Sequence, residues 1–231
     1  EGTGTWDTTT TNWTTDVGVT NVAAPSGAFT SDLIFGGGTL GTAGTVTLAT
    51  TGNDYGSIEF LATNAGTYDI DLNGNDVRLR RSASTIRVGE DATISDGAGG
   101  GALNYAGDTD IRFTDSSKTL SISAVVGDTG GAGTISVNLG GTVDLSGVNT
   151  FTHDITLANQ SQLIVSGTGQ LGSGSYAGNI TMNQGTDFTF SSSADQILSG
   201  IISDDGTGNG NNDVNMSGSG TLTLTGTNTH T

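Results

Sequence analysis

The sequence predicts an all-β chain that winds as a parallel β-helix, or β-solenoid, of about ten coils. Three observations favour this class. The chain has no helical periodicity, it carries many short strands that alternate between apolar and polar residues, and a strand motif recurs about every 77 residues. The composition agrees, because 39 glycines and one proline in 231 residues suit frequent turns around a core of small and medium side chains.

The expected strands are short, have a period of two, and are bounded by Gly, Asn, Asp or Ser. One face of each strand is therefore expected to be buried and the other to meet solvent. The clearest segments are 45–48, 57–60, 68–72, 85–88, 111–113, 134–137, 155–157, 187–190 and 221–224.

The repeat favours a solenoid over a sandwich or a barrel. A Ser/Thr-Asp-apolar-x-Phe motif begins at Ser31, Thr109 and Thr186, so the two intervals between its copies are nearly equal. A unit of that length holds three or four coils of roughly 20–25 residues. We therefore divide the chain into an N-terminal cap region, 1–30, and a β-helix, 31–231, with degenerate repeats at 31–108, 109–185 and, in part, 186–231.

A second pair of segments carries a family resemblance. Residues 141–150 (GTVDLSGVNT) are similar to residues 220–229 (GTLTLTGTNT). The stretch from 198 to 229 resembles the autotransporter-associated β-strand repeat, whose signature ends in Gly-Thr-Leu-x-Leu-x-Gly-x-Asn-Thr. The resemblance implies a right-handed β-helix that is exported to the surface of a Gram-negative bacterium, so an extracellular location is expected.

The charge restricts the partners. The net charge is −17, from 23 acidic and 6 basic residues, and such a surface repels nucleic acid and anionic membranes. The longest apolar runs fall far short of the roughly 18 residues that a membrane helix needs. We expect neither nucleic-acid binding nor direct membrane insertion by this segment.

The candidate catalytic residues are few. The chain has no cysteine, and its two histidines, His153 and His230, are expected to be solvated turn residues. Asp69 and Asp71 point the same way from one strand, and we interpret them as an exterior polar face neutralised by Arg78 and Arg80. The chain is therefore expected not to be an enzyme and to need no cofactor.

Calcium is the one metal that the sequence suggests. The stretch from 204 to 213 offers carboxylate and amide oxygens in a Gly- and Asn-rich loop, which suits a hard cation. Asp204, Asp205 and Asp213 are the candidate ligands. An ordinary solvated turn is the alternative.

All six basic residues lie within one short window of the chain. One interpretation is local neutralisation of acidic side chains on neighbouring strands. The other is a docking patch for a second copy of the chain or for an anionic glycan. The residues are Arg78, Arg80, Arg81, Arg87, Arg112 and Lys118.

Trp6 and Trp13 flank a Thr-rich segment near the start of the chain. A β-helix exposes unpaired strand edges at its ends, and an indole laid over the first coil would cap one of them. If the end is instead left uncapped, copies can stack head to tail into an open fibre.

Together these features predict a non-enzymatic, secreted structural or adhesive protein of the cell surface, with self-association or a surface glycan as its partner. The alternative function is a polysaccharide-binding or polysaccharide-degrading β-helix of the tailspike type. That alternative requires a lateral acidic groove.

Overall fold

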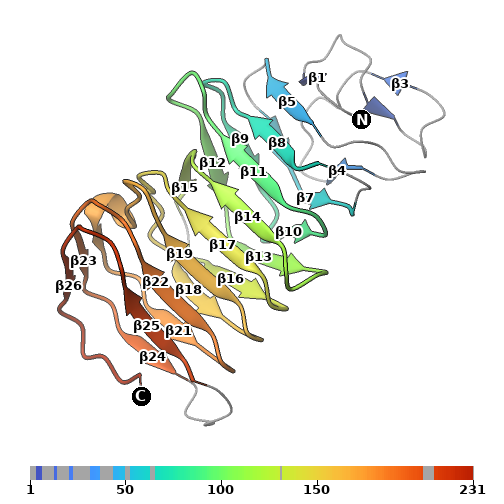
Figure 1. Ribbon diagram of the computed structural model, residues 1–231. Coiled ribbons are helices and arrows are strands. Elements are labelled where there is room, and N and C mark those ends of the chain that lie inside the picture. The colour runs from blue at the N-terminus through green and yellow to red at the C-terminus, as the bar shows by residue number, and fades with distance from the viewer. Residues whose placement is uncertain are drawn as a thin grey trace.

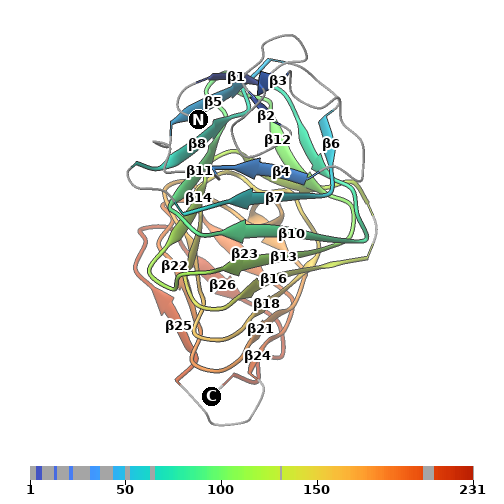
Figure 2. The same cartoon turned by 90° about the vertical axis from the view of Figure 1, so that its right-hand side faces the viewer.

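The chain is a parallel β-solenoid of about seven turns, each built from up to three strands (Figures 1 and 2). The computed structural model describes residues 4–6, 13–14, 21–22, 32–36, 44–49, 53–62, 66–130, 132–204 and 211–230. Along the chain the strands visit three faces in a fixed cycle, and the strands of each face stack one above another. We call these the first, second and third faces.

The first face is a nine-stranded sheet. Its strands are β1 (Gly4–Trp6), β5 (Thr45–Leu48), β8 (Tyr68–Asp71), β11 (Ala92–Ser95), β14 (Thr119–Ile122), β17 (Thr142–Leu145), β19 (Gln162–Val165), β22 (Asp187–Phe190) and β25 (Asp213–Met216).

The second face is an eight-stranded sheet, and its stacking is visible in Figure 2. Its strands are β4 (Asp32–Phe35), β7 (Ser57–Phe60), β10 (Ala83–Val88), β13 (Asp108–Phe113), β16 (Thr134–Asn138), β18 (Asp154–Leu157), β21 (Ile180–Met182) and β24 (Ile202–Asp204).

The third face consists of two shorter sheets. The four-stranded part contains β6 (Asn53–Tyr55), β9 (Val77–Leu79), β12 (Ala102–Tyr105) and β15 (Val125–Asp128). The three-stranded part contains β20 (Ser175–Tyr176), β23 (Gln196–Leu198) and β26 (Leu222–Leu224). A short 3-10 turn, η1 (Gly172–Gly174), precedes β20, and a separate antiparallel pair joins β2 (Trp13–Thr14) to β3 (Asn21–Val22).

Parallel pairing in register produces inward columns of apolar side chains. On the second face one column runs through Leu33, Ile58, Ile86, Ile111, Val137, Leu157 and Met182, all of them buried. Each residue shields the one below it from water, so a narrow core forms from aliphatic side chains with a few aromatic rings. The strands expected from the sequence are all present, with small differences at their ends.

The number of turns is smaller than the ten that the sequence suggested, because several turns use more residues than expected. Thr142 pairs with Gln162 in a short step along the first face, whereas Ile58 pairs with Ile86 in a longer step along the second. Gly4 of β1 pairs with Val46 of β5, so a single step at the N-terminal end uses nearly twice the chain of an ordinary turn.

The recurring Asp-containing motif occupies two different faces. Its first two copies lie in β4 and β13, three turns apart on the second face, where Asp32 and Asp110 belong to one register column. The third copy lies in β22 on the first face. The turns after β13 are on average shorter than those before it. The interval from Asp110 to Asp187 therefore covers three full turns and also the step from the second face to the first.

Two buried amide side chains bridge the break in the third face. Between β15 and β20 the ladder is reduced to one isolated bridge, from Val148 to Gln170. The Asn149 side chain, fully buried, bonds to main-chain groups of this region, and the Gln196 side chain bonds to both the N–H and the carbonyl of Leu171. These side chains satisfy main-chain groups that strand pairing leaves open.

Candidate ligand-binding corner

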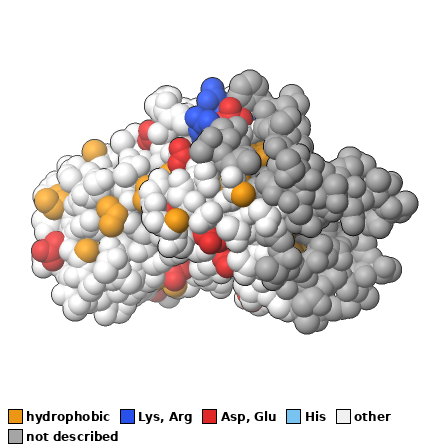
Figure 3. Space-filling view, turned by 90° about the horizontal axis from the view of Figure 1, so that it is seen from above, with side chains coloured by type: hydrophobic (Ala, Val, Ile, Leu, Met, Phe, Trp, Pro, Cys, Tyr) orange, Lys and Arg blue, Asp and Glu red, His pale blue; other side chains and the backbone are white. Residues whose placement is uncertain are grey.

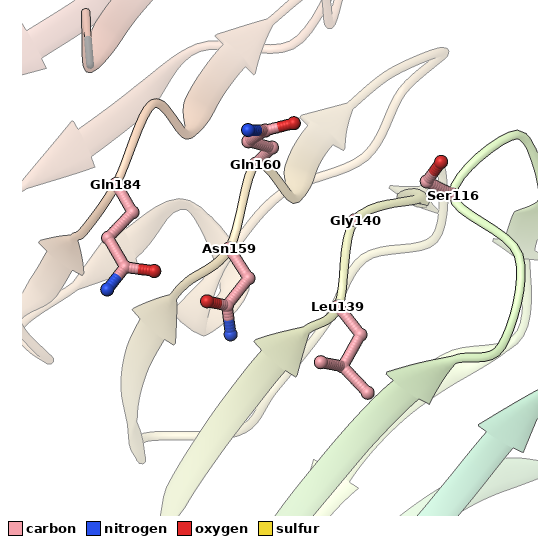
Figure 4. Close-up of a pocket in the computed structure, with 6 residues that line it drawn as sticks. All are labelled: Ser116, Leu139, Gly140, Asn159, Gln160 and Gln184. Carbon is pink, nitrogen blue, oxygen red and sulfur yellow. The ribbon is translucent and has the colours of Figure 1, made fainter. Parts of the chain in front are cut away.

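The corner between the second and first faces carries a shallow groove. It is formed by the turns that follow β13, β16, β18 and β21, and Figure 4 shows the side chains that line it. The lining residues are Ser116, Leu139, Gly140, Asn159, Gln160 and Gln184. We call this depression the corner groove.

Three of these residues occupy equivalent places in successive turns. Leu139, Asn159 and Gln184 each lie two positions after Val137, Leu157 and Met182, which pair directly with one another. They therefore repeat at the strand spacing of about 4.8 Å. In Figure 4 their side chains project to the same side of the turns, whereas Gln160 and Ser116 project to the other. We call these three residues the corner row.

The backbone of the corner row is left-handed. The φ angles are 71° at Leu139, 57° at Asn159 and 63° at Gln184, and Gln160 has a φ of 63°. A side chain in this region costs about 1–2 kcal/mol, less for Asn, whereas glycine adopts it freely. Side chains therefore stand where glycine would be more stable, and such strain is a reason to examine the corner for function.

The amides of the corner groove are not used to hold the fold. Among the described residues, the side chains of Asn159, Gln160 and Gln184 have no hydrogen-bond partner. Elsewhere such amides serve the backbone: the Oδ1 of Asn179 accepts from the N–H of Ile201 at 2.9 Å, and that of Asn212 accepts from the N–H of Gly185 at 3.0 Å. The donors and acceptors of the groove are therefore free to bind a ligand.

The lining carries no ionisable group, and the nearest charges are already engaged. The main-chain N–H and hydroxyl of Ser117 donate to Asp115 at 2.9 and 2.7 Å, and these bonds hold the pKa of Asp115 below its usual range. Lys118 donates to Glu90 at 2.5 Å, which raises the pKa of the lysine. The groove is therefore neutral, and its electrostatic character comes from amide dipoles.

Four of the six basic residues form ion pairs between turns, and Arg112 pairs with Asp110 of its own strand, which agrees with local neutralisation. Figure 3 shows basic side chains gathered in one place with acidic ones beside them. Five of the six basic side chains have an acidic partner within 3.0 Å. The sixth residue, Arg80, also interacts with another residue. The pairs are Arg78–Asp54, Arg81–Asp32, Arg87–Glu59, Arg112–Asp110 and Lys118–Glu90.

The expectation that Arg78 neutralises Asp69 and Asp71 is wrong. Arg78 pairs with Asp54 at 2.8 Å on the neighbouring strand of its own face. Asp69 accepts from the Ser95 hydroxyl at 3.2 Å, and Asp71 accepts from the N–H of Gly97 at 2.9 Å. The two carboxylates hold the next turn in place, because Ser95 and Gly97 lie one turn further along.

The calcium candidates lie at the C-terminal end of the solenoid. Asp204 ends β24 and Asp213 begins β25, whereas Asp205 lies outside the described residues. The part of the chain that the structure describes contains no group of three His, Asp or Glu side chains able to hold a metal ion. Asp213 is paired in register with Asp187; burial and then the charge of Asp213 raise the pKa of Asp187. Calcium binding stays a prediction.

The two tryptophans are placed only through their backbone. Trp6 ends β1, which pairs with β5, and Trp13 begins β2, which pairs with β3. Their side chains lie outside the described residues, so the capping role stays a prediction.

His153 is not the solvated turn residue that the sequence suggested. It is only 4% exposed, and neither ring nitrogen has a hydrogen-bond partner among the described residues. Its carbonyl accepts a hydrogen bond from the hydroxyl of buried Tyr176, whose ring packs edge-on against Phe151. His230 is half-buried, and its Nδ1 is likewise buried with no partner in the described part of the chain. The His153 side chain is therefore a packing element, whereas that of His230 is only partly shielded from solvent.

Sequence reasoning did not find the corner row. Its residues differ in type, and only their equal distance from the preceding strands relates them. Each residue of the corner row directly follows, or lies shortly after, a strand of the second face. This shared position can be recognised only when the pairing register of those strands is known.

No family model, curated protein or solved structure matches this chain. The architecture places it in the class of parallel β-solenoids. Within the described part of the chain, no helix is long and apolar enough to cross a bilayer.

Proposed function

We propose that this protein is a non-enzymatic structural and adhesive rod of the bacterial cell surface. The observation that carries the proposal is the stacking itself: each strand of a face pairs with the next turn, and continuous apolar columns run beneath. Such a chain gains reach with every turn and buries its main-chain polar groups without needing a large core.

The acidic side chains support a structural role over a catalytic one. The carboxylates of Asp69, Asp71 and Asp108 accept hydrogen bonds from the following turn, the last from the N–H of Thr134 at 2.9 Å. Groups used in this way join turns together and are not poised as an acid and base pair.

The resemblance to the autotransporter-associated β-strand repeat supports the proposed location. In the two similar segments, Asn149 and Asn228 make the same contact: each Oδ1 accepts from a main-chain N–H of the preceding turn, that of Val126 at 3.0 Å and that of Ile202 at 2.8 Å. The main-chain N–H groups of the adjacent Thr150 and Thr229 donate to the carbonyls of those residues. Right-handed winding and export belong to this proposal.

Head-to-tail assembly is part of the proposal and rests on geometry. The strands of each face run parallel, so the first strand of one copy could continue the ladder of the last strand of another. In the last described turn, the inward-facing Leu222 of β26 is half-buried and Leu224 is exposed. A further turn stacked on β26 would cover both side chains.

Electron microscopy of the purified protein, together with binding of protein-coated beads to intact bacterial cells, tests the proposal. We expect short rods or end-to-end filaments and bead retention above that of albumin-coated beads. Globular particles, or beads that are not retained, would contradict it.

The enzymatic alternative has its own measurement. The protein is incubated with neutral and acidic polysaccharides, and new reducing ends are counted. A release of reducing ends that Asp69→Asn abolishes would favour a polysaccharide-degrading β-helix.

A further inference from the structure

We infer that the corner row, Leu139, Asn159 and Gln184, is a binding site for an extended neutral polysaccharide that lies along the solenoid axis. The inference rests on the proposed adhesive function and names the ligand class that one surface of the rod would take. It starts from the coincidence of three features at one corner: equivalent register, left-handed backbone and unused amides.

The chemistry of the row matches a sugar polymer. Each side-chain amide offers a carbonyl acceptor and two N–H donors, the combination that pairs with neighbouring hydroxyls of a sugar ring. Leu139 is 52% exposed, and its apolar side chain offers a surface for the C–H face of a ring. Binding sites for small polar ligands combine these two kinds of surface.

The spacing of the row favours a polymer. The three side chains recur once per turn, about 4.8 Å apart, so a ligand with a repeating unit of similar length meets one side chain per unit. The row is also held rigidly, because Asn159 and Gln184 follow strands inside the ladder and the N–H of Gln160 donates to the carbonyl of Gln184 at 3.2 Å. A preorganised row loses little entropy when it binds.

A neutral ligand fits better than a charged one. No cation lines the groove, and the whole chain carries a net charge of −17, so an anionic glycan would be repelled. A peptide strand fits poorly as well. The strands that flank the corner, β16 to β19, are paired on both sides, so no free edge is offered for strand addition.

The left-handed backbone allows a test that separates binding from folding. Substituting glycine for Asn159 or Gln184 keeps the backbone conformation at no steric cost and removes only the side chain. The variants Asn159→Gly and Gln184→Gly are therefore expected to keep or slightly raise the melting temperature. Ser173→Gly is the matched control, because Ser173 is also exposed and left-handed, with a φ of 55°, but lies next to the third face.

Binding is measured by isothermal titration calorimetry with soluble probes: oligosaccharides of β-glucan, mannan and dextran as neutral chains, polygalacturonate as an anionic chain, and an extended Ser/Gly peptide. We expect at least one neutral probe to bind to the wild-type protein and to Ser173→Gly alike. The affinity of Asn159→Gly and Gln184→Gly should fall about tenfold or more, as the loss of one or two hydrogen bonds predicts.

Three results would overturn the inference: no neutral probe binds, the glycine variants bind as the wild type does, or only the anionic chain or the peptide depends on the row. If one of these results is obtained but the wild-type protein still forms rods and its coated beads are still retained, the proposed function stands and only the corner-row site is rejected. If the wild-type protein forms no rods and its beads are not retained, the proposed function itself is rejected.

Discussion

The Oδ1 atom of Asn149 accepts a hydrogen bond from the main-chain N–H of Val126, one turn earlier, at 3.0 Å. The Nδ2 of the same side chain donates to the carbonyls of Gly147 and Gln170 at 2.9 and 3.1 Å. One buried amide thus joins three main-chain groups where the third face lacks a regular ladder.

Asn149→Ala is expected to lower the free energy of unfolding by about 2–4 kcal/mol, because it leaves buried main-chain groups without partners. Urea unfolding followed by circular dichroism measures the effect. Asn215→Ala is the control, since Asn215 is exposed in β25 and should change stability by less than about 0.5 kcal/mol. Equal effects of the two substitutions would contradict the bridging role.

Two glycines with the same backbone angle should respond differently to alanine. Gly141 and Gly99 both have a φ of 78°, but a Cβ at Gly141 would lie 2.4 Å from the Phe113 ring, whereas one at Gly99 would meet none of the described atoms within 4 Å. Gly99→Ala should cost about 1 kcal/mol from backbone strain alone. Gly141→Ala should cost a further 1–3 kcal/mol, roughly, from overpacking. Thermal unfolding of both variants tests this, and similar melting temperatures would speak against tight packing at Gly141.

Replacement of His153 by leucine should stabilise the protein. The histidine is buried, and its ring nitrogens have no partner within the part of the chain that the structure describes, so an apolar side chain of similar volume removes that cost. We expect a gain of about 1 kcal/mol in urea unfolding at pH 7. A loss of stability in His153→Leu would show that the imidazole has a polar partner after all, and would count against its assignment as a packing element.

Asp128 and Asp187 should affect stability with opposite signs as pH changes. Burial opposes ionisation of Asp128, but hydrogen bonds from the N–H and hydroxyl of Thr152, at 2.7 and 2.8 Å, outweigh it and keep its pKa low. Its contribution is therefore present above the unfolded pKa of about 3.9 and is lost as pH falls through the lower folded value.

Burial and the charge of Asp213 raise the pKa of Asp187, so its contribution is present at low pH and is lost as pH rises through the folded value. At pH 7, Asp128→Asn should destabilise and Asp187→Asn should stabilise, each by less than about 1 kcal/mol at these partly exposed sites. Both differences should shrink toward pH 3. Urea titrations at several pH values measure the change in the free energy of unfolding for each variant. A change of the same sign for both variants at pH 7 would contradict the prediction.

The strands and the fold class could be predicted from the sequence because each strand of a solenoid carries its own alternation of apolar and polar residues. In 187–190, for instance, Phe188 and Phe190 are buried and Asp187 and Thr189 are not, as the period of two requires. The alternation is set by the pleat of each strand and does not depend on how many residues lie in the turns.

The stacking register could not be predicted, because it depends on turn lengths. Asp110 stacks above Asp32 but Asp187 stands on another face, since the turns between Asp110 and Asp187 are shorter. The corner row escaped notice for the same reason, as its members share a place in the winding and no residue type. His153 was misjudged because its segment reads as a turn, although the adjacent turns pack over the ring.

Double electron–electron resonance tests the parallel winding most directly, and the chain, which has no cysteine, accepts labelled cysteines freely. Ser57, Thr85 and Ser203 belong to one outward column of the second face, with Ser203 five turns from Thr85 and six turns from Ser57. Parallel winding predicts mean distances of about 24 Å for the pair 85/203 and about 29 Å for the pair 57/203, an increase of roughly one strand spacing per turn. Equal distances for the two pairs, or a shorter one for the pair further apart in the winding, would contradict it.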